Sequence, residues 1–381
     1  MKIFFLDQSG KPGGAELCLI DIAKPYRDRC LVGLFADGSF RDLLEQNQIP
    51  VQILTNQEIQ VRKESNLTQG LASLTQLAPL ITKVATIARE YDIIYANTQK
   101  ALVIGALASF LSRRPLVYHL HDILSPEHFS KTNRAIAVNL ANRASLIIAN
   151  SQASKAAFIE AGGKANIVEV AYNGFDSNLY QISADKITQI RQELGFTDKF
   201  IIGHFSRLSP WKGQHILIEA LAKTPENTTV ILVGDALFGE QDYILKLHQQ
   251  VAKLGLENRV KFLGFRTDIP ELMSVCDLIA HTSTAAEPFG RVIVEGMLCG
   301  KPVIAAKAGG ATEIVEDGIN GFLVTPNQPQ ELSEVITQCV TEIDKTKMLA
   351  TNARISAIAR FDVEVINRQI DEFLYRLADK K

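Results

Sequence analysis

The chain has 381 residues, more than one hydrophobic core usually serves, so its length predicts two domains. With 46% hydrophobic and 22% charged residues, the composition is that of a folded protein and excludes a disordered chain. The formal net charge of -2 gives no broadly basic surface of the kind that nucleic acids attract, so we expect no nucleic-acid partner.

Short apolar or β-branched runs alternate with longer segments of helical period, a pattern typical of parallel sheets covered by helices. The N-terminal run is predicted to be a strand rather than a signal peptide, because Asp7 interrupts it and no small-residue cleavage site follows. The strands expected in the first half are 3–6, 31–35, 51–54, 92–96, 116–120, 146–149 and 167–170. They predict a doubly wound domain over residues 1–175.

The second half repeats the alternation of strands and helices. Its expected strands are 200–205, 230–233, 260–263, 278–281, 302–305 and 322–324. Turn formers collect at 173–178, so we place the boundary there and expect a second doubly wound domain over residues 176–362. The last segment, 363–377, is amphipathic and is predicted to be a helix that docks on an apolar surface.

Neither the apolar runs nor the cysteines indicate a specialised architecture. The longest apolar stretch, 101–111, is about half of the ~20 residues that span a bilayer, so we expect no transmembrane helix and leave peripheral membrane contact open. The five cysteines are scattered and never form a Cys-x-x-Cys pair, so we interpret them as reduced thiols.

A glycine-rich turn, Gly10 to Glu16, follows the first expected strand and opens a helix. Its backbone amides could cradle phosphate oxygens. The alternative is a tight strand-to-helix turn that needs glycine only for its backbone conformation. The glycines do not have the Gly-x-Gly-x-x-Gly spacing of dinucleotide sites, which counts against a dehydrogenase.

Two histidines, His119 and His121, stand two residues apart at the end of the fifth expected strand. This spacing places both side chains on the same side of the strand. Because ligands of open α/β sheets bind beyond the carboxyl ends of the strands, His121, followed by Asp122, is a candidate substrate contact. We interpret His119 as structural.

A basic turn follows the strand 200–205 and carries Arg207 and Lys212. A new helix begins there, so its positive dipole end and the two cations converge. The planar donor fork of arginine and the point charge of lysine together suit a diphosphate. The alternative is an ordinary solvated basic turn.

Two carboxylates, Glu287 and Glu295, bracket the seven residues 288–294. Glu287 falls in the loop after the strand 278–281, whereas Glu295 lies inside the helix that is expected to begin near Gly290. The first amides of that helix, from Phe289 to Arg291, can bind hydroxyl or anionic oxygens. A carboxylate in such an apolar helix needs a partner, and the alternative for Glu295 is a structural ion pair.

Together these motifs resemble the family 4 glycosyltransferases, retaining enzymes of the GT-B architecture, in which two Rossmann-like domains face each other across a cleft. The resemblance covers nearly the whole chain. It is carried by the Glu-x7-Glu segment from Glu287 to Glu295, by Arg207 with Lys212, and by turns at 233–235, 262–264 and 308–315. The first-domain motifs, 13–16 and 121–122, fit the acceptor side.

The resemblance implies a role for each residue of the donor site. Arg207 and Lys212 would neutralise the departing diphosphate, so no metal and no other cofactor is expected. Glu295 would hold the ribose hydroxyls, and Glu287 would hold the transferred sugar. The other residues expected to contact the donor through their backbone are Phe265 and Arg266 for the base, and Phe289, Gly290, Arg291 and Val292 for the sugar.

The resemblance also assigns roles in the first domain. His121 would lie near the anomeric carbon, and the amides of Gly13 and Gly14 would approach the phosphate. The final helix, within 363–381, would pack back on this domain. The predicted catalytic set is therefore His121, Arg207, Lys212 and Glu287.

The expected function is transfer of a hexose, with UDP-glucose as the first choice of donor, to a sugar or lipid-linked glycan in exopolysaccharide or cell-envelope synthesis. The alternatives are a nucleotide-sugar-binding protein of this fold, or a relative that epimerises or hydrolyses the donor. The segment 60–87, with several Leu, Thr and basic residues, suggests an acceptor surface at the cytoplasmic face of a membrane, although a plain exposed helix pair fits equally well.

Overall fold

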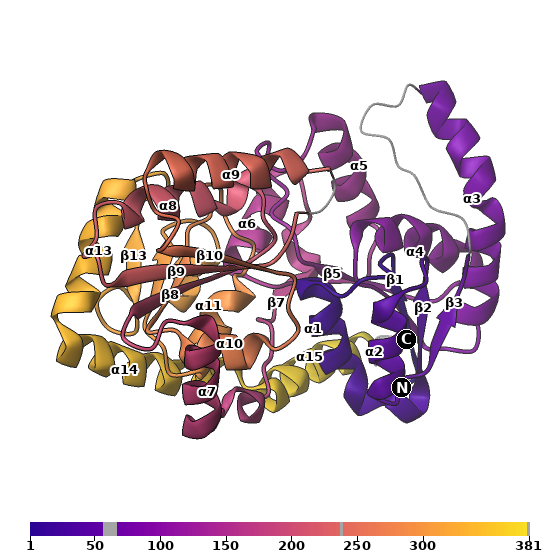
Figure 1. Ribbon diagram of the computed structural model, residues 1–381. Coiled ribbons are helices and arrows are strands. Elements are labelled where there is room, and N and C mark those ends of the chain that lie inside the picture. The colour runs from indigo at the N-terminus through magenta and orange to yellow at the C-terminus, as the bar shows by residue number, and fades with distance from the viewer. Residues whose placement is uncertain (56–66, 237–238, 379–381) are drawn as a thin grey trace. The chain divides into compact units, whose positions relative to one another are not determined.

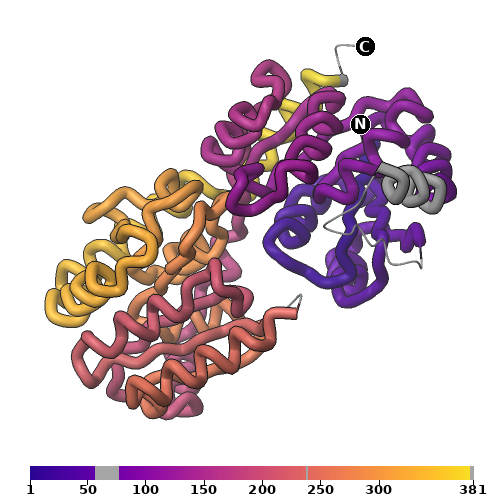
Figure 2. Tube along the Cα trace, turned by 90° about the horizontal axis from the view of Figure 1, so that it is seen from above, coloured from indigo at the N-terminus to yellow at the C-terminus, as the bar shows by residue number. Residues whose placement is uncertain are grey.

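The computed structural model describes residues 1–55, 67–236 and 239–378; for 67–76 and Ala378 it describes the backbone. The chain divides into two compact units. Unit 1 comprises Met1–Gly174 and Val363–Lys381, and unit 2 comprises Phe175–Asp362. The yellow C-terminal segment accordingly lies among the violet elements of unit 1 (Figure 2).

Unit 1 is built on a seven-stranded sheet whose neighbouring strands all pair in parallel. In sheet order the strands are β3 (Val51–Ile53), β2 (Cys30–Leu34), β1 (Ile3–Asp7), β4 (Ile93–Ala96), β5 (Leu116–Leu120), β6 (Leu146–Ala149) and β7 (Val168–Val170). The order reverses between β1 and β4, which is where ligands bind in such sheets.

Helices cover both faces of this sheet, which explains why its strands are continuously apolar. The helices are α1 (Gly14–Ala23), α2 (Ser39–Gln46), α3 (Leu67–Ala88), α4 (Gln99–Ser112), α5 (Lys131–Ala141), α6 (Gln152–Glu160) and α15 (Val363–Ala378), with short 3-10 turns at Lys24–Arg29 and Ala165–Ile167. One core joins the sheet to α3, α4, α5 and α6, and the other joins it to α1, α2 and α15.

The last helix, α15, belongs to the core of unit 1. Ile366, Ile370 and Leu374 are buried in the same cluster as α1 and α2. The Tyr26 hydroxyl also donates a hydrogen bond to the Asp371 carboxylate. The amphipathic pattern of 363–377 therefore reports a helix that returns to the first unit.

Unit 2 is built on a six-stranded sheet, again with all neighbours parallel. In sheet order the strands are β10 (Val260–Gly264), β9 (Thr228–Val233), β8 (Phe200–Phe205), β11 (Leu278–His281), β12 (Val303–Ala306) and β13 (Phe322–Val324). Here the order reverses between β8 and β11, so a second ligand-binding edge is expected at their carboxyl ends.

The helices of unit 2 also cover both faces of its sheet. They are α7 (Ala184–Leu194), α8 (Gln214–Leu221), α9 (Gln241–Lys253), α10 (Ile269–Val275), α11 (Arg291–Leu298), α12 (Ala311–Ile314), α13 (Pro329–Thr341) and α14 (Ile343–Phe361), with 3-10 turns η3 (Ser177–Tyr180) and η4 (Pro210–Lys212). Figure 1 shows α8 and α9 on one side of strands β8 to β10, and α10 and α11 on the other.

The predicted fold class, two Rossmann-like α/β domains of the GT-B type, is confirmed by these two parallel sheets. Every predicted strand is present, with small shifts at some ends, such as Thr228 in place of Val230 for the start of β9. Across the described ranges, no helix is both long enough and apolar enough to cross a membrane.

Candidate functional site

The strongest candidate site lies in unit 2, at the switch between β8 and β11. The loop after β8 carries Arg207 and Lys212, and the loop after β11 carries Glu287. Since β8 and β11 are neighbours in the sheet, their carboxyl ends bring these loops together. Residues far apart in the sequence therefore converge because of the strand order.

Lys212 and Glu287 form an ion pair, with Lys212 Nζ 2.7 Å from Glu287 Oε2. Both side chains are largely buried, with 16% and 12% of their area exposed. His281 Nε2 lies 3.1 Å from the same oxygen, and the Ser283 hydroxyl donates to it at 3.0 Å. The Lys212 ammonium also stands 3.9 Å from the centre of the Trp211 ring, in cation-π contact.

The close approach of the two loops depends on Gly213, which follows Lys212. Gly213 has φ +74°, and a Cβ there would lie 1.9 Å from the Thr282 carbonyl oxygen. The Thr282 hydroxyl donates to the Gly213 carbonyl at 2.9 Å, and the Thr284 amide donates to the Trp211 carbonyl at 2.8 Å. Only glycine fits this position, so Gly213 fixes how near the Lys212 ammonium comes to Glu287.

The backbone of Glu287 is held by a third loop, which follows β12. The Gly310 amide donates to the Glu287 carbonyl at 2.7 Å, and Gly309 forms a β-bridge with Glu287. A Cβ at Gly309 would lie 2.3 Å from that carbonyl oxygen. The Gly-Gly turn noted in the sequence therefore lets two loops touch along their backbones.

The charges around Glu287 keep it ionised. Burial by itself would raise the pKa of Glu287, but Lys212 and His281 outweigh burial and hold the pKa below its usual range. Nearby, burial and His281 lower the pKa of His204 to about 3, so that histidine is neutral. The site thus combines a charged pair with a neutral imidazole beneath it.

Arg207 is positioned by an acid that the sequence analysis did not identify. Its Nε lies 3.4 Å from Glu240 Oε2, and the Ser209 hydroxyl donates to Glu240 Oε1 at 2.7 Å. Glu240 comes directly before α9, after a different strand from Arg207. Its only sequence signal is that it follows β9, the neighbour of β8.

Glu295 forms the ion pair that was one of its two predicted interpretations. Its Oε1 lies 3.5 Å from Arg291 Nε, one helical turn earlier in α11. The Arg291 guanidinium also lies 4.4 Å from the centre of the Phe175 ring. This pair at the start of α11 does not decide between a structural acid and a ligand contact.

The remaining predicted donor residues lie in two places. Phe289 is buried among aromatic rings, with the Phe361 ring centre 5.7 Å away, so only its backbone can meet a ligand. Gly290 and Val292 stand with it at the start of α11. Phe265 and Arg266 follow β10, an edge strand, and Arg266 pairs with Asp268.

A second polar cluster lies in unit 1, at the switch between β1 and β4. Asp7 ends β1, Asn97 follows β4, and His121 follows β5. The Asn97 amide nitrogen donates to Asp7 Oδ2 at 2.7 Å and to the Ala15 carbonyl at 3.1 Å. Asn97 Oδ1, 2.9 Å from His121 Nε2, is then the acceptor, so His121 carries its proton on Nε2.

Sequence reasoning found His121 but not the residue that orients it. Asn97 has no recognisable motif, and only its place directly after a predicted strand could have singled it out. His119 is buried beneath His121, with the ring centres 3.9 Å apart, and its Nδ1 lies 2.8 Å from the Tyr95 hydroxyl.

The glycine-rich turn contains a buried carboxyl. The Gly13 amide donates to Glu16 Oε2 at 2.9 Å, at the start of α1. Burial raises the pKa of Asp7 to about 6; burial, followed by the charge of Asp7, raises the pKa of Glu16 to about 8. A phosphate oxygen at Gly13 would therefore replace a carboxyl group that is neutral over much of the physiological pH range.

The segment proposed as an acceptor surface has one buried and one exposed face where the structure describes its side chains. Residues 60–66, with Arg62 and Lys63, lie outside the described residues. Leu80 and Val84 of α3 are buried in the core of unit 1, and the Lys83 ammonium donates to the Leu54 carbonyl at 2.8 Å. Lys83 is exposed and tied to the Leu54 carbonyl, so its part in an acceptor surface stays a prediction.

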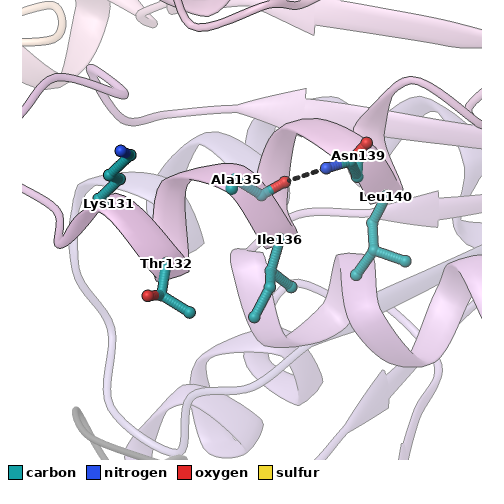
Figure 3. A pocket seen from close by; sticks show the side chains of 6 residues that line it. All are labelled: Lys131, Thr132, Ala135, Ile136, Asn139 and Leu140. Atoms are coloured by element: carbon teal, nitrogen blue, oxygen red, sulfur yellow. Dashed lines mark hydrogen bonds between the residues drawn. The ribbon is translucent and has the colours of Figure 1, made fainter. Parts of the chain in front are cut away.

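An apolar pocket of about 550 Å³ lies along α5. Figure 3 labels its lining residues, which are Lys131, Thr132, Ala135, Ile136, Asn139 and Leu140. The Asn139 amide is used by the helix itself, since it donates to the Ala135 carbonyl at 2.8 Å. The pocket contains none of the predicted site residues.

Comparison with known proteins agrees with the geometry of both units. The family described as "Glycosyltransferase Family 4" matches residues 12–179, and "Glycosyl transferases group 1" matches residues 186–356. A crystal structure of Anabaena HepE in complex with UDP-glucose is 67% identical, with a TM-score of 0.92, over 99% of this chain and 100% of that one. This chain is therefore a glycosyltransferase of the GT-B fold that belongs to family 4.

Curated relatives are more distant. Spore coat protein SA of Bacillus subtilis is 31% identical over 182 residues, which are 45% of this chain and 48% of the relative. N-acetyl-alpha-D-glucosaminyl L-malate synthase of Bacillus anthracis is 30% identical over 55% of this chain and 53% of the relative. The chain thus matches about half the length of these two relatives, and they do not define its substrates.

Proposed function

We propose that this glycosyltransferase moves a glucosyl group from UDP-glucose, with retention of configuration, to a sugar or lipid-linked glycan acceptor in polysaccharide synthesis. The observation that carries the choice of donor is the 67% identity, over nearly the whole of both chains, to HepE structures that hold UDP-glucose or UDP and glucose. The charged site of unit 2 is chemically suited to such a donor.

The diphosphate would bind at Lys212 and Arg207. Negative charge grows on the leaving phosphate as the glycosidic bond breaks, and fixed cations that meet it lower the barrier. Lys212 is held by Glu287 and Arg207 by Glu240, so both cations are oriented before the donor arrives. Because the protein supplies these charges, we propose that the reaction needs no metal.

The transferred sugar would bind beside Glu287. All three donors to this carboxylate, from Lys212, His281 and Ser283, converge on Oε2. Oε1 is then the oxygen that a sugar hydroxyl would approach. The first amides of α11, beginning near Gly290, would donate hydrogen bonds to the remaining sugar oxygens, because a helix does not use these amides in its own hydrogen bonds.

The nucleoside would bind at the other end of the same site. Glu295 would accept hydrogen bonds from the ribose hydroxyls, and backbone groups near Phe265 and Arg266 would select the base. In this role Glu295 keeps Arg291 as its ion-pair partner while a ribose hydroxyl donates to it.

We propose that His121 of unit 1 lies near the anomeric carbon during transfer. Its Nε2 proton is committed to Asn97, so Nδ1 carries the lone pair in the neutral ring. Asp7 and Glu16, two of the carboxyl groups in this cluster, are buried and hydrogen-bonded, which makes them poor nucleophiles. A same-face transfer, in which the leaving phosphate takes the acceptor's proton, is therefore the proposed route to retention.

The choice of a sugar or lipid-linked glycan as acceptor rests on the proposed transferase function and not on a contact in the structure. A lipid-linked glycan would place the reaction at the cytoplasmic face of a membrane. The alternatives are a protein that only binds the nucleotide sugar and an enzyme that hydrolyses or epimerises it. Release of UDP that requires an added glycan would support the transferase; release without any acceptor would support a hydrolase.

The first test is calorimetric titration of the protein with UDP, GDP, ADP and their glucose conjugates, with and without EDTA. Ligand binding also raises the apparent unfolding temperature by mass action, so thermal shifts give an independent reading. We expect UDP and UDP-glucose to bind, and EDTA to leave that binding unchanged. Preference for GDP-glucose or ADP-glucose would replace the proposed donor, and loss of binding in EDTA would contradict the metal-free mechanism.

A further inference from the structure

Three potential metal ligands meet in unit 1 although the sequence separates them widely. Cys18 comes from α1, His119 from β5, and His121 from the residues that follow β5. One ligand atom from each of these residues lies within 4.8 Å of the other two. Cys18 and His119 are buried, whereas His121 is partly exposed and gives the cluster an opening to solvent.

Hydrogen bonds orient both imidazoles for metal binding. His119 Nδ1 lies 2.8 Å from the Tyr95 hydroxyl and His121 Nε2 lies 2.9 Å from Asn97 Oδ1. If Nδ1 of His119 is the donor to Tyr95, its Nε2 carries the lone pair. In metal-binding histidines, one ring nitrogen typically donates a hydrogen bond to an oxygen atom. This hydrogen bond fixes the tautomer and leaves the other ring nitrogen to bind the metal.

His119 Nε2 has no present use in the fold. It is buried, and it has no hydrogen-bond partner among the residues that the structure describes. A buried polar atom of this kind normally has a partner, since leaving it unsatisfied costs free energy. Burial, together with His121, also holds the pKa of His119 well below its usual range, so the ring is neutral, as a metal ligand must be.

We propose that Cys18, His119 and His121 form an inhibitory site for a Zn²⁺-type cation. Zn²⁺ favours thiolate and imidazole ligands in a tetrahedral arrangement. On binding, the Cys18 thiol loses its proton to solvent and forms the sulfur-metal bond, the two imidazoles donate through nitrogen, and a water completes the set. Binding therefore releases a proton and strengthens as pH rises.

Inhibition follows from the position of His121. A bound cation would occupy Nδ1 of the ring that we place near the anomeric carbon. This step rests on the proposed function, whereas the binding of the cation does not. The site would thus make the transferase sensitive to free zinc, even though the transfer itself is proposed to need no metal.

The binding test is titration of the whole chain with Co²⁺, which reports thiolate ligation through charge-transfer absorption. We expect one equivalent to produce this band, Cys18→Ser to abolish it, and His119→Gln to weaken binding by about tenfold or more. Cys299→Ser is the matched control. Cys299 is half-buried whereas the other four cysteines are buried, so a metal that binds thiols non-specifically would bind Cys299 first. No band with the wild-type chain, or a band that Cys18→Ser retains, overturns the proposal.

Folding and activity are checked separately. Circular dichroism shows whether each variant folds; if Cys18→Ser does not, protection of Cys18 from alkylation by Zn²⁺ in the wild-type chain decides the point, and absence of protection overturns the site. Zn²⁺ should slow glucosyl transfer in wild type and not in Cys18→Ser, with reversal by EDTA. If the Co²⁺ band forms but Zn²⁺ leaves transfer unchanged, the inhibitory role is wrong; if no transfer is detected at all, the fault lies in the proposed function.

Discussion

The two candidate sites occupy the same topological position in two similar sheets, yet burial affects their carboxyl groups differently. In unit 2 the switch between β8 and β11 carries ionised pairs, Lys212 with Glu287 and Arg207 with Glu240. In unit 1 the switch between β1 and β4 carries Asp7, whose pKa is raised by burial, beside Asn97.

The difference shows how one fold serves two chemical tasks. Cations that are held by acids attract a diphosphate, because the carboxylates orient them. In unit 1, burial raises the pKa of Glu16 and so keeps that carboxyl largely protonated at neutral pH, which limits the negative charge beside the Gly13 amide. The fold supplies the edge of the sheet, and the residues placed on that edge decide what it binds.

The largest expected effect is the loss of the Lys212 charge. Lys212→Ala should lower kcat with UDP-glucose by about 100-fold or more, because a fixed charge on the leaving group is removed. Initial-rate measurements check this. Lys223→Ala, at a solvent-exposed lysine in the same unit that bonds to Gln330, is the control and should keep normal rates. A normal rate for Lys212→Ala would exclude the leaving-group role.

The second effect tests whether the charge of Glu287 holds the site together. Its pKa is depressed in the folded chain, so its stabilising contribution is present above the ordinary glutamate pKa and is lost as pH falls through the depressed value. Glu287→Gln keeps the shape but removes the charge and should cost about 1 to 3 kcal/mol of unfolding free energy at pH 7.

Thermal unfolding of wild type and Glu287→Gln at several pH values checks this expectation. The difference in unfolding temperature between the two proteins should become smaller in acid, at pH values below the ordinary pKa of glutamate. Glu334→Gln, in an exposed pair with Gln330, is the matched control and should show no such change. A gap that does not depend on pH would mean that packing, rather than charge, is lost.

The sequence predicts those site residues that belong to local patterns, and it does not predict those that depend on contacts between distant segments. Both sheets, α15 and the residues Arg207, Lys212 and Glu287 could be found from periodicity, strand ends and family resemblance. Glu240 and Asn97 could not, since each acts through a partner that follows a different strand, and His281 could not, since it belongs to no motif and acts through Glu287. The direct contact between Lys212 and Glu287 was also not predicted, because it depends on strand order and on Gly213.

The third prediction separates the two interpretations of Glu295. Glu295→Ala should weaken UDP binding by about 1 to 3 kcal/mol if the carboxylate holds the ribose. Since the substitution also removes the partner of Arg291, Arg291→Lys is measured beside it as a variant that keeps the positive charge. Titration calorimetry with UDP gives the result. Unchanged affinity in Glu295→Ala would leave this acid with the structural ion pair alone.

The smallest effect is expected at Glu16, in the polar cluster of unit 1. Its folded pKa of about 8 lies above the ordinary value of 4.5, so the folded chain retains a proton that the unfolded chain loses. The contribution of Glu16 to the free energy of unfolding is therefore fully present below pH 4.5 and falls as pH rises toward 8. Glu16→Gln removes this dependence while its amide oxygen can still accept from Gly13.

Urea unfolding between pH 5 and pH 8 checks the sign of this effect. Relative to wild type, Glu16→Gln should gain stability steadily as pH rises from 5 to 8. Glu160→Gln, at an exposed acid of α6, should follow wild type at every pH. If wild type and Glu16→Gln lose stability in parallel, Glu16 is already ionised at neutral pH, and the contrast between an ionised Glu287 in unit 2 and a protonated Glu16 in unit 1 no longer holds.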